Sequence, residues 1–190
     1  DSDILEVVQF LSFFLNDEQT IKTWLKELVD DKAQLLDVKG NNIFQGRFNP
    51  LMGFSDNIDG LYTDILHKLF NANARQRLKL VNIKNSKGEL ALRVGDAEPF
   101  GLISIGDDSG FYKTAEELES FDSEADDFGG ALFGTLNNKD SKLNVLIGSR
   151  KFTEGWSSWR VSTMGLLNMG QGEGSQIIQL FGRGVRLKGK

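Results

Sequence analysis

The sequence predicts an α/β fold, in which helices flank a parallel sheet and a helical N-terminal segment and a β-hairpin insertion are added. Three observations support this prediction. Apolar residues recur with helical spacing through much of the first 75 residues. Two β-rich runs then flank a turn sequence. Three short apolar runs follow, each ending at or near glycine, and strands separated by helical or loop stretches are typical of a parallel sheet.

Helices are expected in the N-terminal part of the chain. Residues 3–15 are apolar nearly all round, which is typical of a buried helix. Asp17 is placed to cap a helix over residues 18–29, whose apolar residues lie on one face. A further periodic helix is expected over residues 57–73. These helices make up an N-terminal segment, residues 1–75, that leads into the core.

The main domain is expected to occupy residues 76–190 and to begin with a hairpin. Two runs with high β-propensity, residues 78–84 and 89–94, flank the turn sequence Asn85-Ser86-Lys87-Gly88. Such a turn sequence between β-rich runs is a strong local signal, so we predict a β-hairpin here.

Three apolar runs predict further strands. Residues 100–105 form a continuous apolar run that ends at Gly106-Asp107, which suits a buried parallel strand opening into a loop. Residues 143–147 and 161–167 are similar runs. The acidic stretch 115–130 is expected to be a solvated helix and loop, and a carboxylate metal site there is not favoured because the spacing lacks the features of a calcium loop.

Composition excludes several kinds of site. The chain has no cysteine and one histidine, His67, which excludes disulfides, thiolate zinc sites and multi-histidine metal sites. The mean hydropathy is -0.28. Nothing resembles a secretory signal or a membrane span, so a cytoplasmic location is expected. The sequence starts without Met and stops just after its most motif-like segment, which indicates a fragment of a longer protein.

Charge is distributed unevenly along the chain. Residues 142–190 carry eight basic and two acidic side chains, a net charge of +6, whereas the rest of the chain carries -11. This asymmetry indicates either a phosphate-bearing partner at the C-terminal end or a solvated basic face.

The segment from Gln176 to Arg186 is the most informative. Arg183 and Arg186 are three residues apart, so on a helix they share a face. Paired guanidinium groups have the planar, forked geometry that suits phosphate oxygens. The alternative is a basic helix end that is stabilised by the helix dipole.

A second segment joins the predicted strand 143–147 to a polar loop. Ligands of open α/β sheets bind at the carboxyl ends of strands, which is where this loop begins. The loop contains polar, basic and glycine residues: Ser149, Arg150, Lys151, Gly155 and Ser157. Trp156 and Trp159 in the same stretch are interpreted as packing residues, with stacking on bases as the alternative.

Together the two segments resemble motifs V and VI of superfamily 2 helicases, close to the restriction subunits of type III restriction enzymes. Motif VI resembles Q-x-x-G-R-x-x-R, which is matched by Gln179, Gly182, Arg183 and Arg186. Motif V resembles residues 152–156 and the residues that follow. The run 100–107 is placed like motif IV.

The resemblance implies that residues 76–190 form a RecA-like domain, the second motor domain of an ATP-dependent DNA helicase or translocase. ATP and Mg²⁺ would be bound mainly by the first RecA-like domain, because this sequence has no P-loop; the fragment alone is expected to be inert. Arg186 would be the arginine finger and Arg183 its phosphate-binding neighbour. The nucleotide would also be contacted by Gln179, Gly182, Gly155 and Ser157.

The resemblance also implies double-stranded DNA as a partner, and a methyltransferase (modification) subunit in the same restriction-modification system. The DNA backbone would be contacted by Gly106, Asp107, Ser149, Arg150 and Lys151. The alternative function, which needs no motor, is a non-enzymatic phosphate- or nucleic-acid-binding module that uses the same arginines.

Three further patterns have simpler interpretations. Residues 170–175 resemble a dinucleotide-binding loop, but the third glycine is misplaced. Asp37-Val38-Lys39 matches half of a nuclease site and is interpreted as a surface turn. His67, three residues after Asp64, is interpreted as a solvent-facing histidine.

Overall fold

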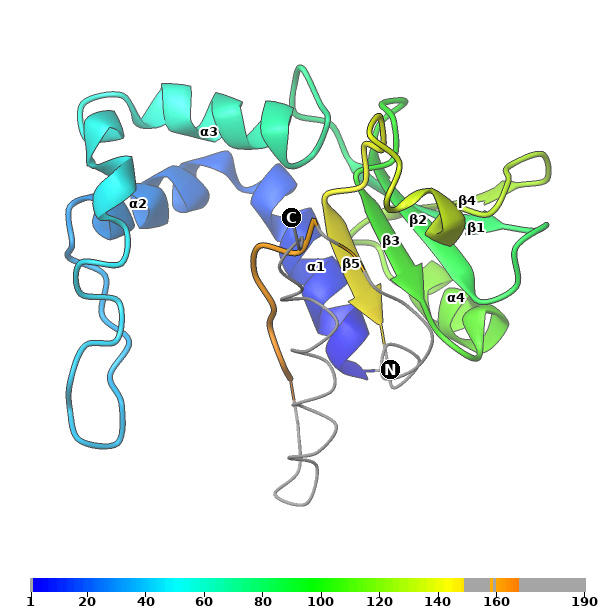
Figure 1. Ribbon diagram of the computed structural model, residues 1–190, viewed down its shortest axis with the longest axis horizontal. Helices are drawn as coiled ribbons and strands as arrows, with labels where there is room; N and C mark the ends of the chain where they lie inside the picture. Colours follow the sequence, from blue (N-terminus) through cyan, green and yellow to red (C-terminus); the bar gives the residue numbers. More distant parts are fainter. Residues whose placement is uncertain (1, 149–157, 159, 168–190) are drawn as a thin grey trace, which may run out of the picture.

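The structure is a computed structural model that describes residues 2–148, 158 and 160–167 (Figure 1). These residues form an α/β fold in which helices pack on a five-stranded mixed sheet. The predicted fold class is therefore confirmed, and at this coarse level the architecture is consistent with a RecA-like domain.

The sheet has the strand order β4-β1-β2-β3-β5. Its strands are β1 (Leu78–Ile83), β2 (Glu89–Val94), β3 (Gly101–Ser104), β4 (Asp122–Asp126) and β5 (Val145–Gly148). The central strand β2 is antiparallel to both neighbours, whereas β1 pairs with β4, and β3 with β5, in parallel. Four strands thus run in one direction, and the predicted hairpin, β1–β2, lies in the middle of the sheet.

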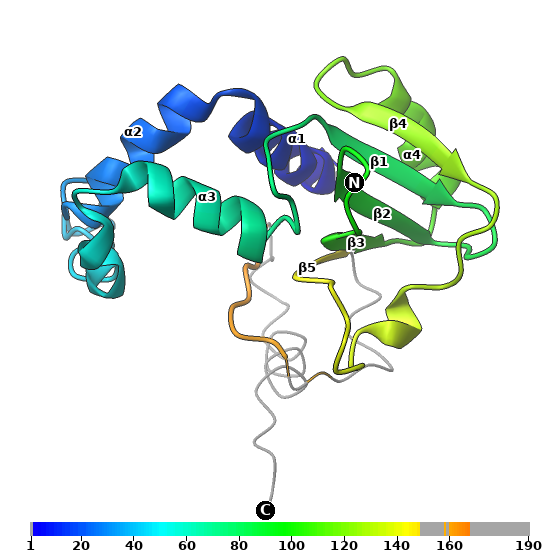
Figure 2. The ribbon, with the colours of Figure 1, turned by 90° about the horizontal axis from the view of Figure 1, so that it is seen from above.

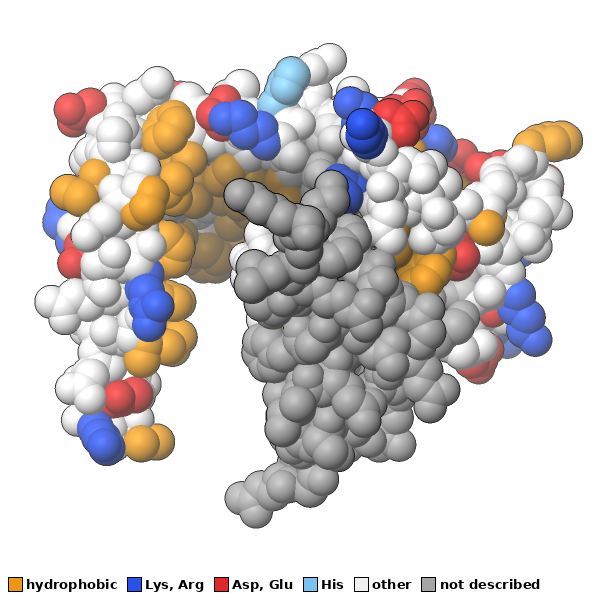
Figure 3. Space-filling view, in the orientation of Figure 1, with side chains coloured by type: hydrophobic (Ala, Val, Ile, Leu, Met, Phe, Trp, Pro, Cys, Tyr) orange, Lys and Arg blue, Asp and Glu red, His pale blue; other side chains and the backbone are white. Residues whose placement is uncertain are grey.

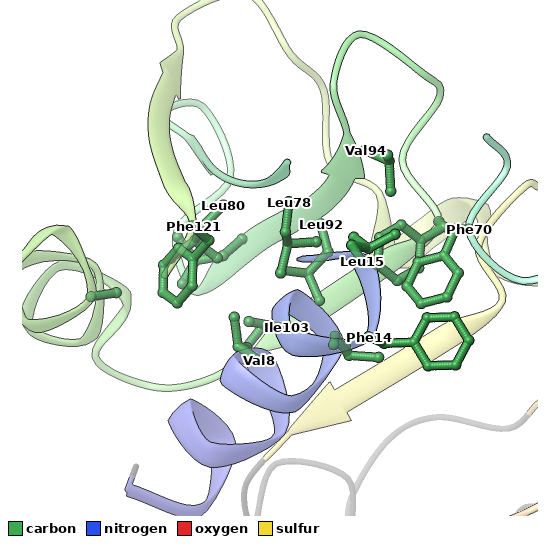
Figure 4. Close-up of a cluster of buried hydrophobic side chains, with 14 of the residues drawn as sticks. Val8, Phe14, Leu15, Phe70, Leu78, Leu80, Leu92, Val94, Ile103 and Phe121 are labelled. Carbon is green, nitrogen blue, oxygen red and sulfur yellow. The ribbon is translucent and has the colours of Figure 1, made fainter. Parts of the chain in front are cut away.

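One face of the sheet is covered by two helices, α1 (Ser2–Asn16) and α4 (Asp108–Glu116). Alternate strand residues face this layer because side chains along a strand point to opposite faces. Figure 4 shows Val8 and Phe14 of α1 pointing toward Ile103 and Phe70. The N-terminal helix therefore belongs to the same core as the sheet.

The opposite face carries a smaller apolar cluster of Val81, Ile83 and Ala91, against which Leu132 packs. Leu132 precedes the short 3₁₀ helix η2 (Phe133–Thr135), which lies across the sheet from α1 (Figure 2). The nearly buried carboxylate of Glu89 accepts hydrogen bonds from the backbone N–H groups of Leu132 (2.7 Å) and Phe133 (3.1 Å). These bonds anchor the segment before β5 to the sheet.

Two further helices form an arm beside the sheet (Figure 1). They are α2 (Glu18–Val29) and α3 (Ile58–Lys68), with the 3₁₀ helix η1 (Asn49–Phe54) between them. Asp17 caps α2 as predicted, since its carboxylate accepts the N–H of Thr20 at 3.1 Å. Figure 3 shows hydrophobic side chains on the side of the arm that faces the rest of the molecule.

Helix α3 ends earlier than the predicted residue 73. The chain turns at Asn71, whose φ of +55° is in the left-handed region. This conformation is incompatible with a continuing right-handed helix, and Asn adopts it more readily than most residues do.

Two other predictions are wrong. Residues 115–130 contain the end of α4 and then strand β4. The acidic side chains of β4 pair with Arg77, just before β1, and with Arg93 of β2: Arg77 with Asp122 (2.9 Å) and Arg93 with Glu124 (2.6 Å). Residues 161–167 are described but form no strand. Polar residues and a glycine interrupt that apolar run, and it is not paired with the sheet.

Asp30, just after α2, makes the stability of the arm dependent on pH. Its carboxylate accepts hydrogen bonds from Lys26 Nζ (2.9 Å), Ser55 Oγ (2.7 Å) and Lys32 Nζ (3.0 Å), which hold its pKa well below the ordinary value of 3.8. The stabilisation is therefore fully present above about pH 5 and is lost as the pH falls through the lowered pKa. We expect Asp30→Asn to flatten the stability profile below pH 4, measured by urea unfolding between pH 2 and 7. A profile as steep as that of the wild type would contradict this role.

No helix in the described part of the chain is long and apolar enough to span a bilayer.

Candidate functional site

The candidate site lies at the edge of the sheet that is formed by the carboxyl ends of the strands, where β3 and β5 end. These strands are parallel and in register, with Ser104 opposite Gly148. The loop that leaves β3 contains Gly106 and Asp107, and the chain that leaves β5 continues directly from Gly148. The two predicted DNA-contact segments therefore begin at neighbouring points of one edge.

Gly106 and Asp107 are both exposed. The Asp107 carboxylate accepts the N–H of Gly110 at 2.9 Å and so caps α4. A Cβ at Gly106 would meet no atom within 4 Å, so its backbone is open to a ligand. A phosphate would have to meet this loop through the open backbone at Gly106, because the negative Asp107 carboxylate already occupies the N-terminus of α4 and repels an anion there.

Two lysines of this edge were missed by the sequence reasoning. Lys84 and Lys87 lie in the exposed β1–β2 turn, next to the β3 loop, since the N–H of Ile105 donates to the carbonyl of Gly88 at 2.9 Å. Lys84 Nζ also lies 5.8 Å from the ring centre of Tyr112 in α4. The turn sequence that contains the two lysines was recognised. The sequence did not show that β1 and β3 run in the same direction, which brings this turn to the same end of the sheet as the β3 loop.

The end of β4 contributes negative charge to the same edge. Asn85 donates to the carbonyl of Asp127 at 2.7 Å, and the N–H of Lys84 donates to the carbonyl of Asp126 at 3.0 Å. Lys84 and Lys87 thus lie between the acidic end of β4 and Asp107. Negative charge therefore lies on both sides of these two lysines.

Most predicted site residues lie outside the described part of the chain. They are Ser149, Arg150, Lys151, Gly155, Ser157, Gln179, Gly182, Arg183 and Arg186, together with Trp156, Trp159 and residues 170–175. Residues 158 and 160–167 of the same region are described. Ser158 is buried, and Arg160 donates to the carbonyls of Leu136 (2.9 Å) and Ser141 (3.2 Å). The chain after β5 is therefore fixed at Arg160 to the segment that precedes that strand.

The two simpler patterns that fall on described residues are as interpreted from the sequence. His67 is exposed on α3. Asp37 accepts the N–H groups of Lys39 (2.8 Å) and Asn41 (2.9 Å), which makes a surface turn. Among the residues that the structure describes, no three His, Asp or Glu side chains are grouped so as to hold a metal ion.

No protein-family model, curated protein or solved structure matches this chain.

Proposed function

We propose that the chain is the second motor domain of a cytoplasmic ATP-dependent DNA helicase or translocase, of the kind found in type III restriction endonucleases. The supporting observation is the register of β3 and β5, with Ser104 opposite Gly148. It brings Gly148, which precedes the motif V-like segment in the sequence, beside the end of the motif IV-like strand. In an α/β sheet this edge is where ligands bind.

In this proposal ATP and Mg²⁺ are held mainly by the first RecA-like domain of the longer protein. Arg186 reaches the γ-phosphate when the two domains close, and Arg183 binds beside it. Arginine side chains of this kind stabilise the charge that develops in phosphoryl transfer. The cycle of closing and opening moves the DNA-gripping loops along the duplex. A methyltransferase subunit would select the DNA.

Contacts to DNA in this proposal are mainly to phosphates. Gly106 and Asp107 offer backbone groups at the start of α4, while Ser149, Arg150 and Lys151 follow β5. Lys84 and Lys87 add positive charge between them and β4. Binding should therefore weaken steeply as salt concentration rises, because each phosphate contact releases counterions.

The test is binding of this chain to a fluorescent DNA duplex at several salt concentrations. We expect Arg150→Ala combined with Lys151→Ala to weaken binding and to lower the slope of log K against log salt by about 0.9 for each lost phosphate contact. The matched control removes two exposed basic side chains of the arm, by Lys39→Ala with Arg47→Ala, and should leave the slope unchanged. An unchanged slope in the first variant, or no binding by the wild type, would overturn the proposed DNA contacts.

A binding module without motor function is the second candidate, because the 190 residues contain no P-loop sequence. The salt-dependent binding would then be retained, but the full-length protein would hydrolyse no ATP in the presence of DNA. An ATPase assay therefore separates the two candidates.

A further inference from the structure

The short strand β5 has little in its own sequence to fix its register. Val145, Leu146 and Ile147 are all apolar and half-buried, and among the described strands β5 lies at the edge of the sheet and pairs with β3 alone. A slip of one residue turns every side chain of a strand to the opposite face, so alternation of polar and apolar residues opposes a slip, and β5 has no such alternation. A shift of β5 along β3 would exchange one apolar side chain for another.

A polar junction lies immediately before β5. The side-chain amide of Asn144 donates to the carbonyls of Lys68 (3.0 Å) and Leu69 (3.0 Å) at the end of α3, and to Asn71 Oδ1 (3.2 Å). The backbone N–H of Asn144 donates to the carbonyl of Phe100 at 2.7 Å. Asn144 therefore connects α3, the start of β3 and the start of β5.

Asn71, which follows α3, makes further hydrogen bonds at this junction. Its side-chain amide donates to the carbonyls of Lys142 (2.9 Å) and Pro99 (3.2 Å), which lie just before β5 and β3. Its left-handed backbone turns the chain toward these carbonyls. The two asparagines thus connect the residues just before β3 and just before β5, and keep the starts of the two strands side by side.

We propose that Asn144, oriented by Asn71, is a positioning residue that fixes the register of β5 on β3. Because β5 has only four residues, its start determines where its end lies relative to β3. Asn144 thereby places Gly148 opposite Ser104, two residues before Gly106. The consequence for DNA binding rests on the proposed function, whereas the register itself does not.

Disulfide trapping tests the register directly, because the chain has no cysteine of its own. Ser104→Cys with Gly148→Cys reports the observed register, and Ser104→Cys with Leu146→Cys reports a shift of two residues. Neighbouring strands bring paired residues within the range of about 4.4–6.8 Å between Cα atoms that a disulfide requires. In the otherwise wild-type chain, mild oxidation should link the first pair and not the second.

Adding Asn144→Ala should lower linkage of the first pair several-fold and raise that of the second. Asn144→Asp, which keeps the shape and removes the amide donors, should do the same. The control Asn42→Ala removes an amide that donates to Ala33 within the arm (3.1 Å) and should change neither pair. Unchanged linkage in both Asn144 variants would overturn the proposal. Unfolding of both would overturn it as well, since loss of a register contact at an edge strand should leave the core folded.

DNA binding by the same variants separates this inference from the proposed function. If the wild type binds DNA, Asn144→Ala should weaken binding several-fold and Asn42→Ala should not. If the wild type binds no DNA, the proposed function fails, while the disulfide result still decides the register.

Discussion

Substitution of Arg186 by alanine in the full-length protein should lower DNA-stimulated ATP hydrolysis by about 10³-fold or more. The expected size follows from its proposed position at the γ-phosphate, where a guanidinium stabilises the charge of the transition state. The measurement is the steady-state kcat for ATP at saturating DNA. Arg186→Lys should be strongly impaired as well, because an ammonium cannot reproduce the planar fork of the guanidinium.

Lys188→Ala is the matched control for this prediction. It removes one positive charge two residues away, at a position outside the Q-x-x-G-R-x-x-R pattern. We expect its kcat to stay within a few-fold of the wild-type value. Near-normal hydrolysis by a folded Arg186→Ala variant would contradict the arginine-finger role and leave this segment as a basic binding surface.

Phe70→Ala should produce the largest loss of stability, about 3–5 kcal/mol in the free energy of unfolding. Phe70 is fully buried, and its ring centre lies 5.3 Å from that of Phe14 and 4.8 Å from that of Phe100. It therefore joins α1, the end of the arm and the start of β3. Its removal would leave a large cavity at that junction.

Urea unfolding followed by circular dichroism measures this loss. Phe128→Ala is the control, since the Phe128 side chain is 96% exposed and its removal should change stability by no more than about 0.5 kcal/mol. A loss below about 1 kcal/mol in Phe70→Ala would contradict the central position of this ring in the core.

Local patterns predicted the elements whose causes are local. Helices α1 and α2 were predicted to within a residue or two, because apolar periodicity and the Asp17 cap lie within the segments themselves. The β1–β2 hairpin was predicted from its turn sequence for the same reason. Strands β3 and β5 were visible as apolar runs.

Elements that depend on distant partners were not predictable in this way. Strand β4 is acidic and becomes a strand by pairing with β1. Arg77, just before β1, meets Asp122, and Arg93 of β2 meets Glu124. The early end of α3 depends on Asn71, whose partners lie 28 and 71 residues further along the chain. Neither feature has a periodic signal in its own segment.

In the candidate site, too, features with local causes were predicted and features that depend on distant segments were not. The strand-end position of Gly106 and Asp107 was predicted from the apolar run before them, and the structure adds that Asp107 caps α4. Lys84 and Lys87 were missed, because their place at this edge depends on the strand order β4-β1-β2-β3-β5. Strand order depends on the whole sheet and cannot be inferred from the turn sequence.

The most direct test of the proposed motor function is movement along DNA. The full-length protein would be given a duplex that carries a triplex-forming oligonucleotide, and release of the oligonucleotide would be followed with and without ATP. We expect release that requires ATP and that is abolished in Arg186→Ala, with DNA binding retained in both. Tight, salt-dependent binding of the duplex without ATP-dependent release would contradict the motor and support the binding module.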